Sequence, residues 1–256
     1  MSSQTMLPES LTTLQRQRVG SQSGSRDQKT QSRPALPAVI TRAASKQTYY
    51  TVRFLVDRSR TLNAYRAYAY FRWVDDWLDR KSVIEAARAA FIERQQALID
   101  ACYRGERVPD ATREERMLVD LVSSEPAPEN GLRAYVNHMM AVMRFDTQRR
   151  GQLVSYAELE RYSYHLAAAV TEALHYFIGH DRYSPQGDER YRAATGAHIA
   201  HMLRDTHEDI EAGYYNVPCE LLRENGIAPS DTESAPYREW VRSRVEQARA
   251  DFAAGR

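Results

Sequence analysis

The sequence predicts an all-α fold, and three observations support this prediction. From about residue 42 onward, apolar residues recur every three or four positions, which is the period of an amphipathic helix. No stretch alternates apolar and polar residues as a half-buried strand does. Beyond residue 42, glycine and proline are sparse and lie largely between the periodic stretches. Long helices joined by short loops indicate a helical bundle.

Helices are expected in nine stretches of the chain. In order, they cover about residues 42–58, 61–80, 82–104, 112–123, 129–149, 155–180, 187–213, 217–225 and 234–253. The gaps contain turn-forming residues, which run from 105 to 109, 126 to 131, 185 to 187 and 226 to 229. Ser155 followed by Glu158 predicts a capping box at the start of helix 155–180, because each side chain reaches the other's backbone N–H.

Composition excludes several classes of protein. The chain has 35 basic and 34 acidic residues, and a net charge of +1 argues against binding nucleic acid by bulk charge. Cys102 and Cys219 are too few for a disulfide scaffold. Apolar runs fall short of the roughly 18 residues of a membrane span, and the N-terminus does not resemble a secretory signal. We therefore expect a cytoplasmic protein.

Residues 1–41 have a different texture from the rest of the chain. They are rich in Ser, Gln, Thr and Arg, and the stretch SQSGSRDQKTQSRPALP shows no apolar periodicity. Such a segment cannot bury enough apolar surface to offset the entropy lost on ordering. We expect a disordered N-terminal tail over residues 1–41 and a helical domain over 42–256.

Two of the predicted helices place carboxylates on one face. In helix 61–80, residues spaced by three or four positions share a face; they are Tyr65, Tyr68, Arg72, Asp75 and Asp79. In helix 187–213 the same spacing joins His198, His201, Asp205 and Asp209, with Arg204 beside them. One exposed Asp pair four residues apart costs only about 0.2–0.5 kcal/mol, so either pair alone fits a solvated acidic face.

Two such pairs facing each other inside a bundle would need a cation. Carboxylates about 4 Å apart repel by roughly 4 kcal/mol per pair at an effective dielectric constant near 20. Mg²⁺ takes oxygen ligands and usually bridges one or two carboxylates to substrate phosphates, and Mn²⁺ is the alternative. The sequence thus predicts a metal–phosphate site if the pairs face each other, and a solvated face if they do not.

Five segments carry motifs in a fixed order and spacing. They are SKQTYY at 45–50, AYAYFRWVDDWLD at 67–79, MRFDTQRRG at 143–151, YAELERYSYHLAAAVTEAL at 156–174 and MLRDTHEDIEAGYYNVPCELLRENGI at 202–227. Together they resemble the squalene/phytoene synthase family over about residues 42–252. The second segment is similar to the first aspartate motif of the family, and the fifth is similar to the second aspartate motif.

The resemblance implies a class I isoprenoid-synthase helical bundle with a central cavity. Enzymes of this family join two allylic prenyl diphosphates, such as farnesyl or geranylgeranyl diphosphate, head-to-head. The resemblance implies Mg²⁺ ligands at Asp75, Asp79, Asp205 and Asp209. It also implies phosphate contacts from Arg72 and Arg204, and stabilisation of an allylic cation by the ring of Tyr68. Peripheral membrane association is expected because products of the family are lipids, and the use of NADPH is left open.

Further residues are assigned to substrate binding by the resemblance. They are Ser45 and Lys46 of the Ser-Lys signature, Ala168 in a run of small residues, Thr171, His198, His201 and Tyr214. Several of these depart from the family pattern. His198 and His201 replace Gln and Asn, Thr171 stands where Gly is common, and Gly-Tyr-Tyr-Asn at 213–216 replaces Gly-Arg-x-Tyr. The family continues for about two helices beyond the position of Arg256, so the last family helices are expected to be missing.

These departures keep other functions open. A class I terpene cyclase acting on a single prenyl diphosphate would use the same Mg²⁺ chemistry. Two further alternatives would carry out no Mg²⁺-dependent reaction. One is a degenerate protein that binds prenyl diphosphates without turnover, and the other is a helical interaction protein with the aspartates on its surface. Glu172 and His175 match half of a di-iron carboxylate motif, but a second such pair is missing from the sequence.

Overall fold

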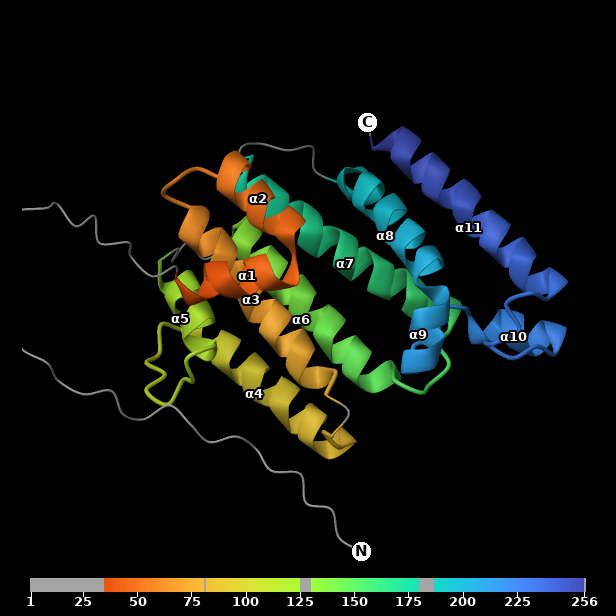
Figure 1. The fold of residues 1–256 in the computed structure, drawn as a ribbon, viewed down its shortest axis with the longest axis horizontal. Coiled ribbons are helices and arrows are strands. Elements are labelled where there is room, and N and C mark those ends of the chain that lie inside the picture. The colour runs from red at the N-terminus through yellow and green to blue at the C-terminus, as the bar shows by residue number, and fades with distance from the viewer. Residues whose placement is uncertain (1–34, 81, 125–129, 180–186, 256) are drawn as a thin grey trace, which may run out of the picture. The chain divides into compact units, whose positions relative to one another are not determined.

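The computed structural model describes residues 35–80, 82–124, 130–179 and 187–255, and these parts of the chain form helices without strands (Figure 1). The helices are α1 (Leu36–Ala44), α2 (Lys46–Leu55), α3 (Thr61–Leu78), α4 (Glu85–Tyr103), α5 (Glu115–Ser123), α6 (Gly131–Arg149), α7 (Tyr156–Phe177), the 3₁₀ helix η1 (Asp188–Tyr191), α8 (Arg192–Arg204), α9 (Thr206–Ala212), α10 (Cys219–Asn225) and α11 (Ala235–Ala254). The predicted all-α fold is confirmed.

The predicted tail lies mostly outside the described residues. Residues 1–34 are not described, but α1 begins at Leu36 with a proline in its first turn, where the missing N–H costs nothing. The expectation of disorder is therefore wrong for residues 36–41. None of the helices in the described part of the chain is long and apolar enough to cross a bilayer.

Two predicted helices are broken in the structure. The stretch 42–58 was expected as one helix, but Ser45 has extended backbone and its Oγ accepts a hydrogen bond from the N–H of Thr48 at 3.1 Å, so it ends α1 and caps α2. The stretch 187–213 divides into η1, α8 and α9, and Asp205 lies between the last two. The capping box of Ser155 and Glu158 is confirmed at the start of α7.

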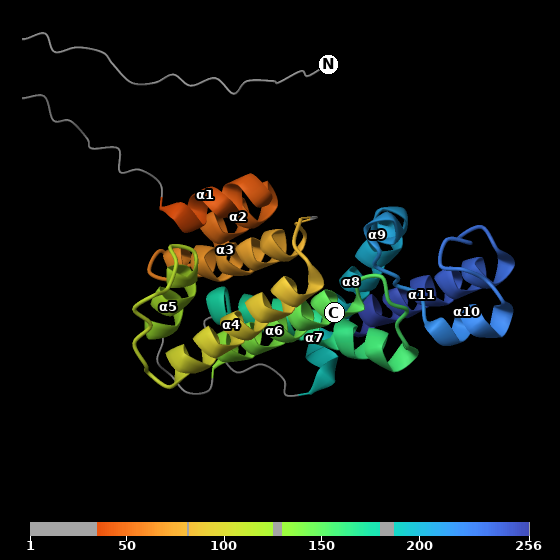
Figure 2. The ribbon, with the colours of Figure 1, turned by 90° about the horizontal axis from the view of Figure 1, so that it is seen from below.

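The main core surrounds α3. Tyr70 and Val74 of α3 are completely buried, together with Leu118 and Leu121 of α5 and Val136 of α6. Helices α1 and α2 pack on the outer side of α3, away from α4, α6 and α7 (Figure 2). Helix α3 is therefore enclosed on both sides, which fixes the direction of its carboxyl-terminal aspartates.

A second core joins the carboxyl-terminal helices to the bundle. Met202 of α8, Leu222 of α10 and Trp240 of α11 belong to it. Helices α8 and α11 approach closely at Gly196, where a Cβ atom would lie 2.9 Å from the carbonyl oxygen of Ala248 (Figure 1). This packing holds α8, and with it the second aspartate segment, against α7.

Candidate active site

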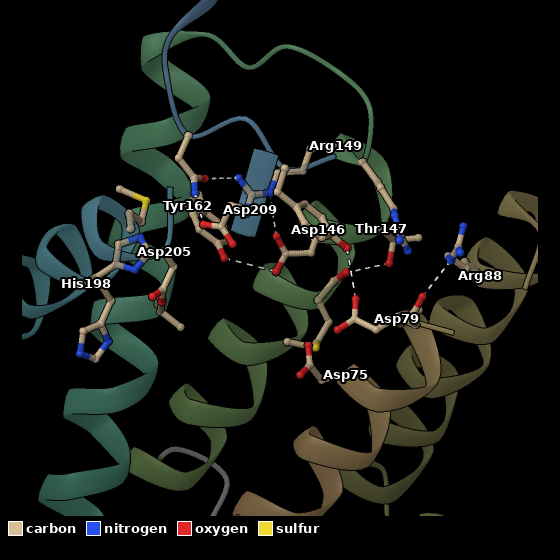
Figure 3. Close-up of a pocket in the computed structure, with 18 residues that line it drawn as sticks. Asp75, Asp79, Arg88, Asp146, Thr147, Arg149, Tyr162, His198, Asp205 and Asp209 are labelled. Atoms are coloured by element: carbon tan, nitrogen blue, oxygen red, sulfur yellow. Dashed lines mark hydrogen bonds and ion pairs between the residues drawn. The ribbon is translucent and has the colours of Figure 1, made fainter. Parts of the chain in front are cut away.

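A polar pocket of about 280 Å³ lies between the carboxyl-terminal ends of α3, α6 and α8. Its acidic lining comprises Asp75, Asp79, Asp146, Asp205 and Asp209, and its basic lining comprises Arg88, Arg149 and Arg150. Figure 3 shows Asp75 and Asp79 on one side, Asp205 and His198 on the other, and Asp146 between them. The two predicted carboxylate faces therefore meet in one pocket.

An apolar cavity of about 730 Å³ adjoins this pocket. Both spaces are lined by Asp75, Met143, Asp146, Tyr162, Leu166 and His201. The remaining lining of the cavity is mainly apolar and comes from α2, α3, α6 and α7, with Phe71, Val142 and Phe177 among its residues. A single space thus has a charged end and an apolar end, as expected for a ligand with a polar head and a hydrocarbon tail.

The α3 aspartates lie close together and are poorly neutralised. Burial raises the pKa of Asp75, and the charges of Asp79 and Asp146 raise it more than Arg72 lowers it, so the pKa is about 6. Arg72 lies 3.3 Å from Asp75 and forms a closer ion pair with Asp76, so α3's own carboxylates occupy its guanidinium. Like charges that persist in a partly buried site favour the binding of a cation.

A buried arginine at the end of α6 connects four parts of the site. Arg149 donates to Asp146 Oδ1 at 2.7 Å and to Asn216 Oδ1 at 2.7 Å (Figure 3). Asn216 donates in turn to Asp209 Oδ2 at 2.7 Å. The guanidinium carbon of Arg149 lies 4.5 Å from the centroid of the Tyr162 ring, whose hydroxyl donates to Asp146 at 3.3 Å.

Backbone contacts bring this arginine to its partners. The turn after α6 meets the turn after α9, because the N–H of Gly151 donates to the carbonyl of Gly213 at 2.7 Å. Gly213 has a φ of 86°, a left-handed conformation that glycine adopts without strain. Residues 214–216 therefore reverse toward the pocket.

Sequence reasoning missed Asp146, Arg149, Tyr162 and Asn216. The first two stand three residues apart in MRFDTQRRG, a spacing that places them on one helix face and could have indicated a pair. Asn216 gave no such signal, because a polar residue in a loop is normally solvated.

The second aspartate segment is arranged differently from the first. Arg204 donates to Asp205 Oδ1 and Oδ2 at 2.6 and 2.7 Å, and this ion pair lowers the pKa of Asp205. The side chain of Arg204 is 67% exposed and does not line the pocket, where the sequence placed a phosphate contact. Burial raises the pKa of Asp209.

The two histidines of α8 both line the pocket, and His201 also lines the apolar cavity. His198 is buried, and its Nε2 atom has no hydrogen-bond partner. Burial lowers the pKa of His198 to about 4, and the nearby charges of Arg244 and Arg149 act in the same direction. His198 is therefore a neutral imidazole beside Tyr162, whose ring centroid is 5.4 Å away.

The other predicted residues divide into two groups. Tyr68 lines the apolar cavity, and Tyr214 lines the polar pocket, where its hydroxyl donates to Asp79 Oδ1 at 3.4 Å. The remaining four line neither space: Ser45 caps α2, Lys46 is exposed, and Ala168 and Thr171 are buried in α7. Leu166 and Val170 of α7 line the cavity instead.

Glu172, the carboxylate of the half di-iron motif, contacts other side chains instead of facing the pocket. Glu172 accepts a hydrogen bond from the hydroxyl of Tyr191 at 2.8 Å and forms an ion pair with Arg190. It does not line the polar pocket or the apolar cavity.

The carboxylates of the pocket differ from a metal site built by the protein alone. Within the described residues, no three His, Cys, Asp or Glu side chains are close enough together to hold one. Mg²⁺, however, usually takes only one or two carboxylates and completes its shell with water and substrate phosphates. The oxygen donors of this pocket therefore fit Mg²⁺ held jointly with a diphosphate rather than by the protein alone.

Comparison with known families identifies the chain. The squalene/phytoene synthase family model matches residues 41–256, which is most of the sequence. A search among curated proteins found no match. The match begins within α1 and covers the other helices, the pocket and both aspartate segments, so the resemblance seen in the sequence is confirmed. The chain belongs to the squalene/phytoene synthase family.

Proposed function

We propose that this protein ionises allylic prenyl diphosphates, farnesyl or geranylgeranyl diphosphate, and joins two of them head-to-head in a Mg²⁺-dependent reaction. One observation carries the proposal: an apolar cavity of about 730 Å³ shares part of its lining with a pocket of carboxylates and arginines. The shared residues define the place where the carbon–oxygen bond of the substrate would break.

The two spaces match the two ends of such a substrate. Burying the prenyl chain stabilises the complex by about 0.8 kcal/mol per methylene group. The diphosphate then lies in the polar pocket, where Arg150 offers a buried Nη1 atom without a hydrogen-bond partner. A buried donor left unpaired costs about 1–3 kcal/mol, which a phosphate oxygen would recover.

Asp75 and Asp79 on one side of the pocket, and Asp209 on the other, are the residues that would each hold Mg²⁺ jointly with the diphosphate, and Asp205 would join Asp209 once it leaves Arg204. When bound, the ion acts as a Lewis acid that offsets the charge of the departing diphosphate. Tyr68 and Phe71 line the apolar cavity, where their aromatic rings would stabilise an allylic cation. The apolar lining excludes water that would otherwise trap the cation.

His198 supports the same orientation of substrate. His198 lines the polar pocket, where the diphosphate would lie, and its Nε2 atom has no hydrogen-bond partner. As a neutral imidazole it supplies one N–H donor, and anionic phosphate oxygens are acceptors. We propose that the Nε2–H of His198 donates to the diphosphate, in place of the amide that the family carries there.

Incubation with C10, C15 and C20 prenyl diphosphates tests the function, with Mg²⁺ or with chelator, followed by mass spectrometry of the extracts. Head-to-head coupling predicts a Mg²⁺-dependent product with twice the substrate's carbon count. A product with an unchanged carbon count would instead show a cyclase. Stabilisation of the fold by a prenyl thiodiphosphate without any release of diphosphate would show a binding protein and refute the proposed turnover.

A further inference from the structure

The outward face of α2 is unusually apolar for a solvent-exposed surface. Phe54 is 72% exposed, Leu55 is 60% exposed and Tyr50 is 47% exposed. The rings of Tyr50 and Phe54 stack at a centroid distance of 6.0 Å, so they present one continuous surface. We call these three residues the α2 face. Exposed apolar groups gathered in this way mark a binding surface more often than isolated ones do.

Exposed basic residues accompany the α2 face along the chain. Arg42 and Lys46 precede it, Arg53 lies within it, and Arg58 follows it. Asp57 is the single acidic residue between positions 36 and 60. A helix with aromatic and aliphatic groups beside lysine and arginine suits the interface of an anionic bilayer, where rings enter the headgroup layer and cations meet lipid phosphates.

The α2 face also adjoins an opening of the apolar cavity. Gln47 and Thr51 line the cavity, and Phe54 follows them at seven and three residues, so all three share one side of α2. Across the cavity, Val170 and Leu174 of α7 line its wall while remaining 44% and 48% exposed. The cavity therefore reaches the surface between α2 and α7.

We propose that the α2 face docks onto an anionic lipid bilayer and turns this opening of the cavity toward the lipid. A second copy of the chain fits the face less well, because a twofold dimer would bring the same basic residues together. Docking itself depends only on the surface. Its consequence, that an apolar product passes from the cavity into the bilayer without crossing water, rests on the proposed function.

Vesicle sedimentation with the full chain tests the proposal. Vesicles of phosphatidylcholine alone are compared with vesicles that also contain phosphatidylglycerol, without substrate or metal. We expect binding to the anionic vesicles that weakens as salt is added. Phe54→Asp should reduce the partition coefficient about tenfold or more, since it removes the burial of a phenyl ring. Ile84→Asp is the matched control. Ile84 is 71% exposed, but it follows the carboxyl-terminal end of α3, whereas α2 precedes the amino-terminal end. This variant should bind vesicles like the wild type.

Three results would overturn the proposal. The first is that the wild-type protein does not bind anionic vesicles. The second is that Phe54→Asp and Ile84→Asp weaken binding equally. The third is that sedimentation velocity shows a dimer that Phe54→Asp dissociates, which would assign the face to a second copy. Phe54→Ser repeats the test without a new charge, and circular dichroism checks the fold. Release of diphosphate in lipid-free buffer is measured separately, so a failure of the proposed function is distinguished from a failure to dock.

Discussion

The two aspartate pairs of the pocket are held in different ways. Asp75 and Asp79 lie one turn apart at the end of α3, and the helix runs unbroken up to Leu78. Asp205 and Asp209 are separated by the junction of α8 and α9, and Asp205 lies at the junction itself. The first pair is fixed by one rigid helix, whereas the second depends on how two short segments are joined.

The charges of the two pairs differ as well. Burial raises the pKa of Asp75 to about 6, whereas the ion pair with Arg204 lowers the pKa of Asp205. The α3 pair thus retains negative charge that the protein does not balance. In the second segment, Arg204 already neutralises the carboxylate of Asp205. If the pocket binds Mg²⁺ as proposed, the α3 pair can do so directly, whereas Asp205 must first separate from Arg204.

Breaking the link between the two sides should have the largest effect. Arg149→Met would leave Asp146 buried without its cation and Asn216 without its donor. Removing one partner of a buried ion pair costs about 3–5 kcal/mol. We expect that loss in the unfolding free energy, measured by urea denaturation. Arg144→Met is the control on the same helix; its exposed ion pair with Glu93 spans 3.5 Å and is worth less than about 1 kcal/mol. Equal losses would show that the network does not hold the site together.

The next largest effect is expected on turnover, when one carboxylate of the α3 pair is neutralised. With farnesyl diphosphate and Mg²⁺, Asp75→Asn should reduce the release of diphosphate by at least about a hundredfold, because stabilisation by a metal ion is worth several kcal/mol. Asp76→Asn is the control, since Asp76 forms the closer ion pair with Arg72 but does not line the pocket. If both variants retain full activity, the pocket is not the catalytic site.

Helical periodicity was sufficient to predict the fold class but not every helix boundary. The helices that carry the first aspartate pair and the central segments were placed within a few residues, because long apolar faces dominate there. The breaks at Ser45 and Asp205 were missed. Serine and aspartate are tolerated within helices and are also favoured at helix caps. Which of these positions they take depends on the tertiary structure and not on the local sequence.

The candidate site was predictable where its residues share a helix and unpredictable where distant segments meet. Helical spacing placed Asp75 and Asp79 on one face without any knowledge of their neighbours. Arg149 and Asn216 are 67 residues apart in the chain, so their contact leaves no local pattern. The resemblance implied a phosphate contact for Arg204, but its outward position and its ion pair with Asp205 depend on the tertiary structure.

The raised pKa of Asp75 should make the unfolding free energy depend on pH, and the lowered pKa of Asp205 acts in the opposite direction. The folded pKa of Asp75, about 6, exceeds its ordinary value of 3.8. The folded state therefore holds this proton more tightly, and the resulting stability is present below pH 3.8 and lost as the pH rises through 6. The full shift would be worth about 3 kcal/mol, but the side chain is 38% exposed, so solvent screening leaves about 1 kcal/mol. In chelator, Asp75→Asn should match the wild type near pH 4 and exceed it by that amount near pH 7. A gap of equal size at both pH values would contradict this assignment.

The smallest effect is expected where the second pair is already neutralised. Arg204→Gln should leave the melting temperature unchanged, because the ion pair with Asp205 is exposed and gains little in water. It should nevertheless free Asp205, so the Mg²⁺ concentration for half-maximal turnover should fall by about twofold and the difference should vanish at high salt. Arg242→Gln, which breaks a more exposed arginine–carboxylate pair with Glu239 on α11, should change neither quantity. If the Mg²⁺ dependence of Arg204→Gln does not change, Asp205 contributes less to Mg²⁺ binding than Asp75 does. The two aspartate segments would then differ in function as well as in geometry.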